Sequence, residues 1–287
     1  MTPEAVSDAL VGRASLPYED VDSPGRRVVL ECYRPEAYRD GPVVIVQHGM
    51  GRNGDEYCDA WMPAADRHGL LIVAPTFPES DWPGPACYND GHVRAADGSV
   101  RSRSGWSNAL PGRVLRLLRD ASVTTRRRAT LWGHSAGGQF VHRLLALQGA
   151  DDFEAVGAAN AGWYTWPTLD RPYPEGLGGI GLTEADLVRW LEYKLVVFAG
   201  DQDLGSENLP QGEAASAQGP TRFARAHAFL EAGRAAAAGL GVACGWSLVV
   251  VPGVGHEGMR MAAAAAGYWF DGALPTMEPG RAVGTEA

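Results

Sequence analysis

The residues at 133–137 read Gly-His-Ser-Ala-Gly, and their G-x-S-x-G spacing is typical of a serine nucleophile on a sharp turn. Such a turn joins a strand to a helix, and it needs small residues two positions before and after the serine. An apolar run at 129–132 precedes this serine, and helix-like residues at 136–147 follow it. The alternative is a glycine-rich turn with a capping serine. The flanking sequence favours catalysis, so we predict Ser135 as the nucleophile.

A serine hydroxyl of ordinary acidity needs a general base, and that base needs an orienting group. In hydrolases built on such a turn, the acid and then the histidine follow the nucleophile along the chain. Here a predicted strand at 195–198 runs into a Gly-Asp-Gln-Asp turn, and another at 248–251 runs into a glycine-rich loop that ends at His256. We therefore predict His256 as the base and Asp203, the fourth residue of the turn, as the acid. Asp201 is expected to accept N–H groups of its own turn.

Six further histidines have structural explanations that fit better than catalysis. The side chain of His134, inside the serine turn, is expected to point away from the tip of the nucleophile. The remaining five lie in predicted helices, at a helix end, in a long loop or in a glycine-rich turn: His48, His68, His92, His142 and His227.

An oxyanion that develops during acyl transfer needs backbone N–H donors fixed in advance. The glycine-rich segment 46–54 follows a predicted strand, and its glycines let the backbone approach a ligand closely. We expect the N–H groups of Met50 and Ala136 to be the two donors. A phosphate-binding loop is less well supported, because no G-K-[ST] follows and the chain is acidic.

Strands alternate with helices along the chain, which predicts an α/β fold with a mostly parallel sheet covered by helices on both faces. We expect one domain over residues 1–287, with a lid-like insertion at 164–193. A capping box beginning at Thr183 is predicted to start a helix in that insertion. The expected strands are 27–33, 43–47, 70–74, 129–132, 154–159, 195–198 and 248–251, and the expected helices are 56–67, 111–120, 136–147, 222–236 and 259–270.

The motifs His48-Gly49-Met50-Gly51, Gly133 to Gly138, Gly200-x-x-Asp203 and Gly255-His256 occur together in this order. In this combination the chain resembles bacterial α/β-hydrolases of the polyhydroxybutyrate-depolymerase and feruloyl-esterase-like group, over roughly residues 40–270. The resemblance implies esterase chemistry without a cofactor. It is specific for the fold and the catalytic triad, and it says little about the substrate.

Aromatic residues near the predicted site offer walls for a substrate pocket. Trp163 and Tyr164 follow the strand after the nucleophile helix, and Trp106 lies in a long loop. We predict that these three bind substrate; equally, such residues can simply anchor loops onto the core. The predicted activity is hydrolysis of a small, aromatic or short polyester ester through an acyl-enzyme. Alternatives are an amide or thioester hydrolase on the same fold and a non-catalytic binding protein.

Composition narrows the function classes further. With 34 acidic and 25 basic side chains the formal charge is −9, which disfavours nucleic acid and anionic membranes as partners. No metal-binding motif occurs, so we expect neither a metal nor another cofactor. The first residues are polar, so we expect a cytoplasmic protein, unless a signal peptide preceded this numbering, in which case the protein is periplasmic or secreted. Four dispersed cysteines are expected to be free thiols. The oligomeric state is left open.

Overall fold

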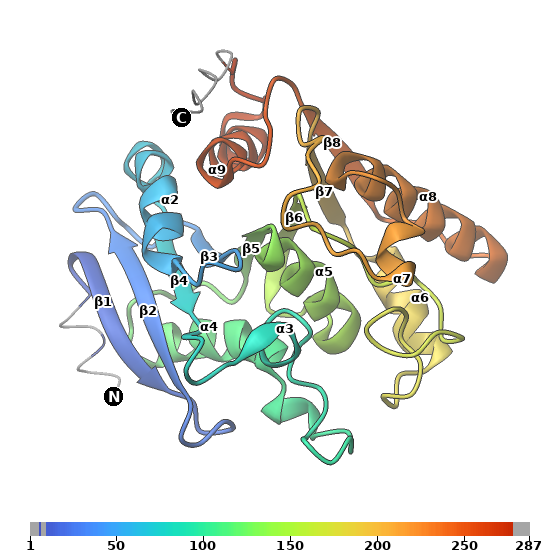
Figure 1. Ribbon diagram of the computed structural model, residues 1–287. Coiled ribbons are helices and arrows are strands. Elements are labelled where there is room, and N and C mark those ends of the chain that lie inside the picture. Colours follow the sequence, from blue (N-terminus) through green and yellow to red (C-terminus); the bar gives the residue numbers. More distant parts are fainter. Residues whose placement is uncertain (1–5, 7–9, 278–287) are drawn as a thin grey trace, which may run out of the picture.

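The computed structural model describes residue 6 and residues 10–277, and these form an eight-stranded sheet flanked by helices (Figure 1). The strand order is β1-β2-β4-β3-β5-β6-β7-β8, and only the pairs β1–β2 and β2–β4 are antiparallel. The strands are β1 (Gly12–Glu19), β2 (Arg27–Arg34), β3 (Val43–Gln47), β4 (Leu71–Thr76), β5 (Ala129–His134), β6 (Phe153–Ala159), β7 (Leu195–Gly200) and β8 (Ser247–Val251). The predicted mostly parallel sheet is confirmed.

Helices cover both faces of this sheet. In Figure 1, α2 and α9 lie together on one face, whereas α4, α5, α6 and α8 lie on the other. The α-helices are α2 (Gly54–His68), α3 (Gly84–Cys87), α4 (Leu110–Asp120), α5 (Ala136–Gln148), α6 (Glu184–Glu192), α7 (Glu213–Ser216), α8 (Arg222–Leu240) and α9 (Gly258–Ala266).

The central strands are apolar along their whole length because both faces are buried. Successive side chains of a strand point to opposite faces. Thus Val43 and Ile45 of β3 join the core beneath α4, α5 and α8, while Val44 and Val46 join the core beneath α2 and α9. The sheet therefore separates two hydrophobic cores, and the site lies where its parallel strands end.

Several elements differ from the sequence-based expectation, and among them the short helices α3 and α7 were not predicted. Strand β1 was not predicted; its side chains are mostly half-exposed or exposed, so no alternation of apolar residues marks it. The predicted helix at 259–270 ends as an α-helix at Ala266 and continues as the π-helical turn Gly267–Asp271. Strand β1 and the π-helical turn lie outside the strand ends that carry the predicted site, whereas α7 borders the larger cavity described below.

Helix α6 begins with the predicted capping box. The Thr183 hydroxyl accepts from the Asp186 N–H, and the Asp186 carboxylate accepts from the Thr183 N–H at 2.8 Å. Trp190 and Leu191 on this helix are buried in the core. The helical part of residues 164–193 therefore belongs to the connection between β6 and β7, and a lid in this segment stays a prediction.

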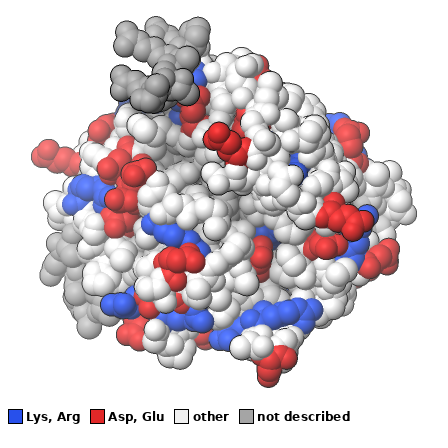
Figure 2. Space-filling view, viewed as in Figure 1, with Lys and Arg blue, Asp and Glu red and all other residues white. Residues whose placement is uncertain are grey.

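The surface carries charges of both signs. On the face shown in Figure 2, the acidic and basic side chains of the described residues are interspersed, without an extended basic area. Among helices in the described part of the chain, none combines the length and apolar character required to cross a membrane.

Candidate active site

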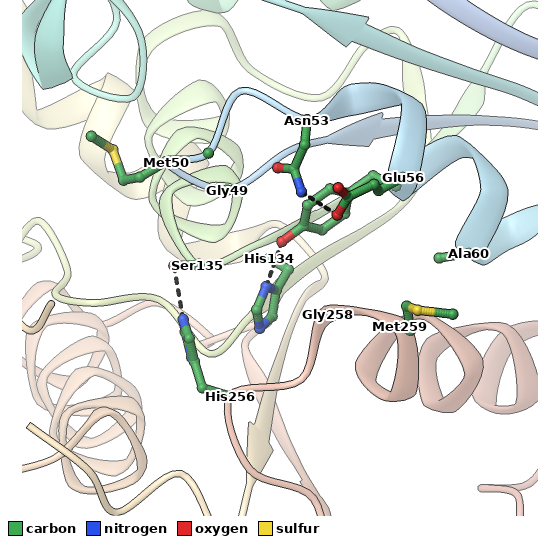
Figure 3. Close-up of a pocket in the computed structure, with 12 residues that line it drawn as sticks. Gly49, Met50, Asn53, Glu56, Ala60, His134, Ser135, His256, Gly258 and Met259 are labelled. Atoms are coloured by element: carbon green, nitrogen blue, oxygen red, sulfur yellow. Dashed lines mark hydrogen bonds between the residues drawn. The ribbon is translucent and has the colours of Figure 1, made fainter. Parts of the chain in front are cut away.

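Three loops at the ends of parallel strands bring Ser135, His256 and Asp203 together. Ser135 follows β5, Asp203 follows β7, and His256 follows β8. His256 Nε2 lies 3.0 Å from Ser135 Oγ, as Figure 3 shows, and His256 Nδ1 lies 2.7 Å from Asp203 Oδ2. Because a carboxylate can only accept, Nδ1 carries the proton and Nε2 is free to take one from the serine.

Ser135 occupies the strained turn that its motif predicts. Its φ of 58° and ψ of −116° are unusual for a residue other than glycine. A Cβ on Gly133 would lie 2.3 Å from the Gly137 carbonyl oxygen, and one on Gly137 would lie 2.1 Å from the Gln47 carbonyl oxygen. Any larger residue at these two positions would therefore push the turn apart and displace the hydroxyl.

The two neighbouring aspartates make different contacts. Asp203 is only 2% exposed, and its second carboxylate oxygen lies 3.5 Å from the Arg222 guanidinium. Asp201 accepts the N–H of Gly253 at 2.8 Å. Asp201 was expected to bind N–H groups of its own turn, but it instead connects that turn to the loop preceding His256. The hydrogen-bond partner of the Asp201 side chain lies in the loop after β8, and the composition of the turn after β7 does not reveal that contact.

His134 lies closer to the predicted base than the sequence suggested. Its ring lies beside that of His256 (Figure 3), with the centroids 4.6 Å apart. Its Nδ1 is 2.8 Å from the Tyr57 hydroxyl. Burial holds the pKa of His134 well below the usual histidine value, with further lowering by the nearby His256 and Arg222. Burial also raises the pKa of Tyr57. A neutral phenol and a neutral imidazole therefore meet here, and the tautomer of His134 sets which of the two donates.

The Tyr57 hydroxyl fits between two glycines from different loops. A Cβ on Gly49 or on Gly258 would each lie 3.0 Å from this hydroxyl oxygen. Gly49 belongs to the predicted oxyanion segment, and Gly258 lies two residues after His256. Tyr57 thus packs against both loops at once.

The segment predicted to supply an oxyanion donor is held by a buried histidine. His48 Nδ1–H donates to the Gly49 carbonyl at 2.8 Å, and Nε2 accepts the Phe77 N–H at 3.0 Å. Burial lowers the pKa of His48 to about 3, so the ring stays neutral and can both donate and accept. Met50, in the same segment, has a half-exposed side chain beside Ser135.

Two cavities meet at Ser135. A cavity of about 300 Å³ extends between α2 and the start of α9, and one of about 630 Å³ extends towards α7. Met50, Ser135 and His256 line both cavities. The candidate nucleophile is thus accessible from two sides.

Of the three predicted substrate-binding aromatics, only Trp163 lines either of these cavities. Tyr164 is buried and stacks on Phe229 with ring centroids 4.4 Å apart. Trp106 is also buried, and its Nε1–H donates to the Arg101 carbonyl at 3.0 Å. The prediction is therefore wrong in placing Tyr164 and Trp106 at the pocket wall. The sequence places these aromatic residues on loops. It does not show whether the side chain points into the hydrophobic core or towards the cavity, because that depends on how the surrounding elements pack.

Sequence reasoning missed the polar wall of the larger cavity. Gln139 and the buried Arg143 follow Ser135 at intervals of four residues, which places all three along one side of α5. Arg143 forms an ion pair with Asp90 at 2.7 Å, and its guanidinium lies 4.9 Å from the centre of the Trp163 ring. The available signal was the spacing of four residues from Ser135 to Gln139 and from Gln139 to Arg143, in a helix that is mostly apolar.

The described residues include no group of three or more His, Cys, Asp or Glu side chains placed to hold a metal ion. All four cysteines are unpaired.

Comparison with known proteins shows the class. No protein-family model and no curated protein matches the chain. Solved structures do: LpqC, a poly(3-hydroxybutyrate) depolymerase from Bordetella parapertussis, is 49% identical, with 96% of each chain covered and a TM-score of 0.94. Poly(aspartic acid) hydrolase-1 from Sphingomonas sp. KT-1 is 32% identical over 90% of this chain and 98% of that one, with a TM-score of 0.86.

A more distant structure shares the fold alone. The S-formylglutathione hydrolase from Agrobacterium tumefaciens is 14% identical, with coverage of 89% of this chain and 92% of that one and a TM-score of 0.60. Taken with the nearer relatives, these similarities show that the chain is a hydrolase of the α/β-hydrolase family. Within that family it belongs to the polyhydroxybutyrate-depolymerase-like group, as its motifs predicted.

Proposed function

We propose that this hydrolase is a serine-dependent carboxylic-ester hydrolase that acts through an acyl-enzyme on Ser135. The observation that carries the proposal is the continuous hydrogen-bonded path from Ser135 Oγ through His256 to the buried Asp203. A serine alone is a weak nucleophile, and this arrangement supplies a base in the correct tautomer and an acid that stabilises the imidazolium.

In the first half of the reaction, His256 Nε2 takes the Ser135 proton while Oγ attacks the ester carbonyl carbon. The N–H groups of Met50 and Ala136 are the proposed donors to the resulting oxyanion. The imidazolium then protonates the departing alcohol oxygen, which leaves an ester of Ser135. In the second half, His256 activates a water that attacks this ester, and the proton returns to Oγ as the acid product leaves.

The substrates that we propose are small or aromatic esters and short polyesters. The relative that is 49% identical is a poly(3-hydroxybutyrate) depolymerase, so short hydroxyalkanoate oligomers are the first to test. Amide hydrolysis at the same site is the second candidate, favoured by the similarity to poly(aspartic acid) hydrolase-1. Parallel assays with p-nitrophenyl esters and aminoacyl anilides separate the two.

The test of the mechanism is Ser135→Ala, with fluorophosphonate labelling as a second readout. We expect loss of ester turnover by several orders of magnitude and loss of labelling, because Ser135 Oγ is the proposed site of acylation. The melting temperature should change little, since only a hydroxyl at a cavity wall is removed.

Ser104→Ala, at an exposed serine outside both cavities, is the matched control and should retain activity and labelling. Ester turnover at the wild-type rate by a pure Ser135→Ala preparation would refute the proposed nucleophile.

A further inference from the structure

The wall of the larger cavity contains an amide group whose orientation is fixed by its neighbours. Gln139 Oε1 accepts from Asn89 Nδ2 at 3.0 Å and from Arg143 Nη1 at 3.3 Å. An amide oxygen has two lone pairs, and both are used here. Flipping the Gln139 amide would place its NH₂ group against the Arg143 guanidinium, which can only donate, so the assignment of Oε1 and Nε2 follows from this contact.

The other end of the amide is left without a protein partner. Nε2 of Gln139 has no hydrogen-bond partner among residue 6 and residues 10–277, although it could donate twice. A Cβ on Gly162 would lie 3.0 Å from this nitrogen. Gln139 and Gly162 both line the larger cavity, together with Ser135. A donor is thus presented beside the nucleophile, where glycine keeps the approach open.

Arg143 makes this arrangement rigid. It is fully buried and donates to Thr165 Oγ1 at 2.9 Å and to the Asn89 carbonyl at 3.0 Å, in addition to its ion pair with Asp90. A buried guanidinium is costly unless it is paired. Its Nη2 has no hydrogen-bond partner among the described residues, and the contacts of Nε and Nη1 hold the group in place. The Gln139 amide is therefore preorganised, and a ligand that uses it does not have to immobilise it.

The charges around the cavity indicate which ligand oxygen fits. Glu175 and Glu213 line it, whereas the lining Arg222 is paired with Asp203 and with the Glu207 carbonyl. A carboxylate on the ligand would be repelled by the carboxylates of these two glutamates. A hydroxyl or an ester carbonyl carries no charge and would not be repelled. Trp163, Leu209 and Pro210 add apolar surface for the carbon chain.

We propose that Gln139 Nε2–H donates to a neutral oxygen of the substrate unit in the larger cavity and thereby selects hydroxy-acid esters over alkyl esters of equal size. This inference rests on the proposed ester hydrolysis and deepens it. Gln139 is then a specificity-determining residue, and the substrate class is an ester with a hydroxyl or a second ester carbonyl next to the cleaved bond.

Two pairs of matched esters test this preference, one for each side of the cleaved bond. The acyl pair is p-nitrophenyl 3-hydroxybutyrate against p-nitrophenyl 3-methylbutyrate, in which a methyl replaces the hydroxyl. The alcohol pair is the butyrate of methyl 3-hydroxybutyrate against 2-hexyl butyrate. We expect wild-type kcat/KM to favour the oxygen-bearing member of at least one pair by about tenfold, the scale of one preorganised hydrogen bond.

Gln139→Glu is the decisive variant, because it keeps an acceptor for Asn89 and Arg143 while replacing the donor with an oxygen. We expect it to lose the preference, so that the two kcat/KM values differ by less than about twofold. Gln139→Met, of similar length and without a donor, should behave in the same way and decides the matter if Gln139→Glu does not fold. Gln148→Glu, on the last turn of α5 and outside both cavities, should keep the preference.

Equal wild-type kcat/KM values within both pairs would overturn the inference. So would retention of the preference in the folded Gln139 variants. Failure of the wild-type enzyme to cleave any of the four esters would instead contradict the proposed ester hydrolysis, and the inference would fall with it.

Discussion

At the scale of single residues, the two aspartates after β7 provide a sharp test. Asp203→Asn should lower kcat by about 10⁴-fold, because an amide can hold the wrong histidine tautomer and cannot stabilise the imidazolium. Asp201→Asn keeps an oxygen that can accept the Gly253 N–H, so it should retain activity and lose at most about 1 kcal/mol of stability. Steady-state kinetics and denaturant unfolding measure both effects.

The two variants serve as controls for each other, since the substitution is the same and the positions are two residues apart. If the Asp203→Asn variant were active and the Asp201→Asn variant inactive, the roles assigned to the two aspartates would have to be exchanged.

A part of the site could be predicted from the sequence when its residues belong to a local motif or follow the strand order. Contacts between residues far apart along the chain could not be predicted. Ser135 lies in a local motif, and His256 and Asp203 follow strands in an order that the fold dictates, so their neighbourhood was predictable. The contact between His134 and Tyr57 joins residues 77 positions apart, and the Gln139 contact with Asn89 joins residues 50 apart. No local pattern encodes such pairs. They follow from packing of whole elements.

At the scale of elements, α6 offers a prediction for its capping box. Thr183→Ala removes the side-chain acceptor for the Asp186 N–H and should lower the free energy of unfolding by about 1 kcal/mol. Thr183→Ser keeps the hydroxyl and should recover most of that loss. Urea unfolding followed by circular dichroism compares the two. Equal stability of Thr183→Ala and the wild type would show that the cap contributes nothing measurable.

Prediction of the elements themselves succeeded where burial imposes a pattern. Strand β3 was predicted with its observed bounds, because both faces are buried and the strand is a short apolar run between polar turns. Strand β1 was missed because it lies at the sheet edge and pairs only with β2. The extended conformation of β1 depends on its backbone hydrogen bonds to β2, and the residue composition of β1 does not indicate that pairing.

At the scale of the whole molecule, buried neutral histidines predict sensitivity to acid. Burial lowers the pKa of His48 to about 3 and that of His92 to about 4, and it holds the pKa values of His134 and His142 well below the usual range. Below about pH 6.5 the unfolded chain binds protons that the folded protein excludes, so stability falls as the pH falls. Each fully buried histidine should lower the free energy of unfolding by about 2 kcal/mol as the pH falls from about 6.5 to about 5.

Denaturant unfolding at pH 7.5 and pH 5 measures this loss. The exposed His227 provides the control, because His227→Gln should leave the difference between the two pH values unchanged. A free energy of unfolding that stays constant or increases towards pH 5 would contradict the prediction.

The position of the Tyr57 hydroxyl has an evolutionary consequence. Helix α2, the nucleophile turn and the loop after His256 come from distant parts of the chain, yet they meet at this one oxygen atom. A Cβ at position 49 or 258 would lie 3.0 Å from the tyrosine hydroxyl oxygen and would require the tyrosine to shift slightly, and a smaller residue at position 57 would leave His134 Nδ1 without its partner. Substitutions here are therefore epistatic: a change at one position becomes acceptable only after a compensating change at another, so divergence should proceed through coupled replacements.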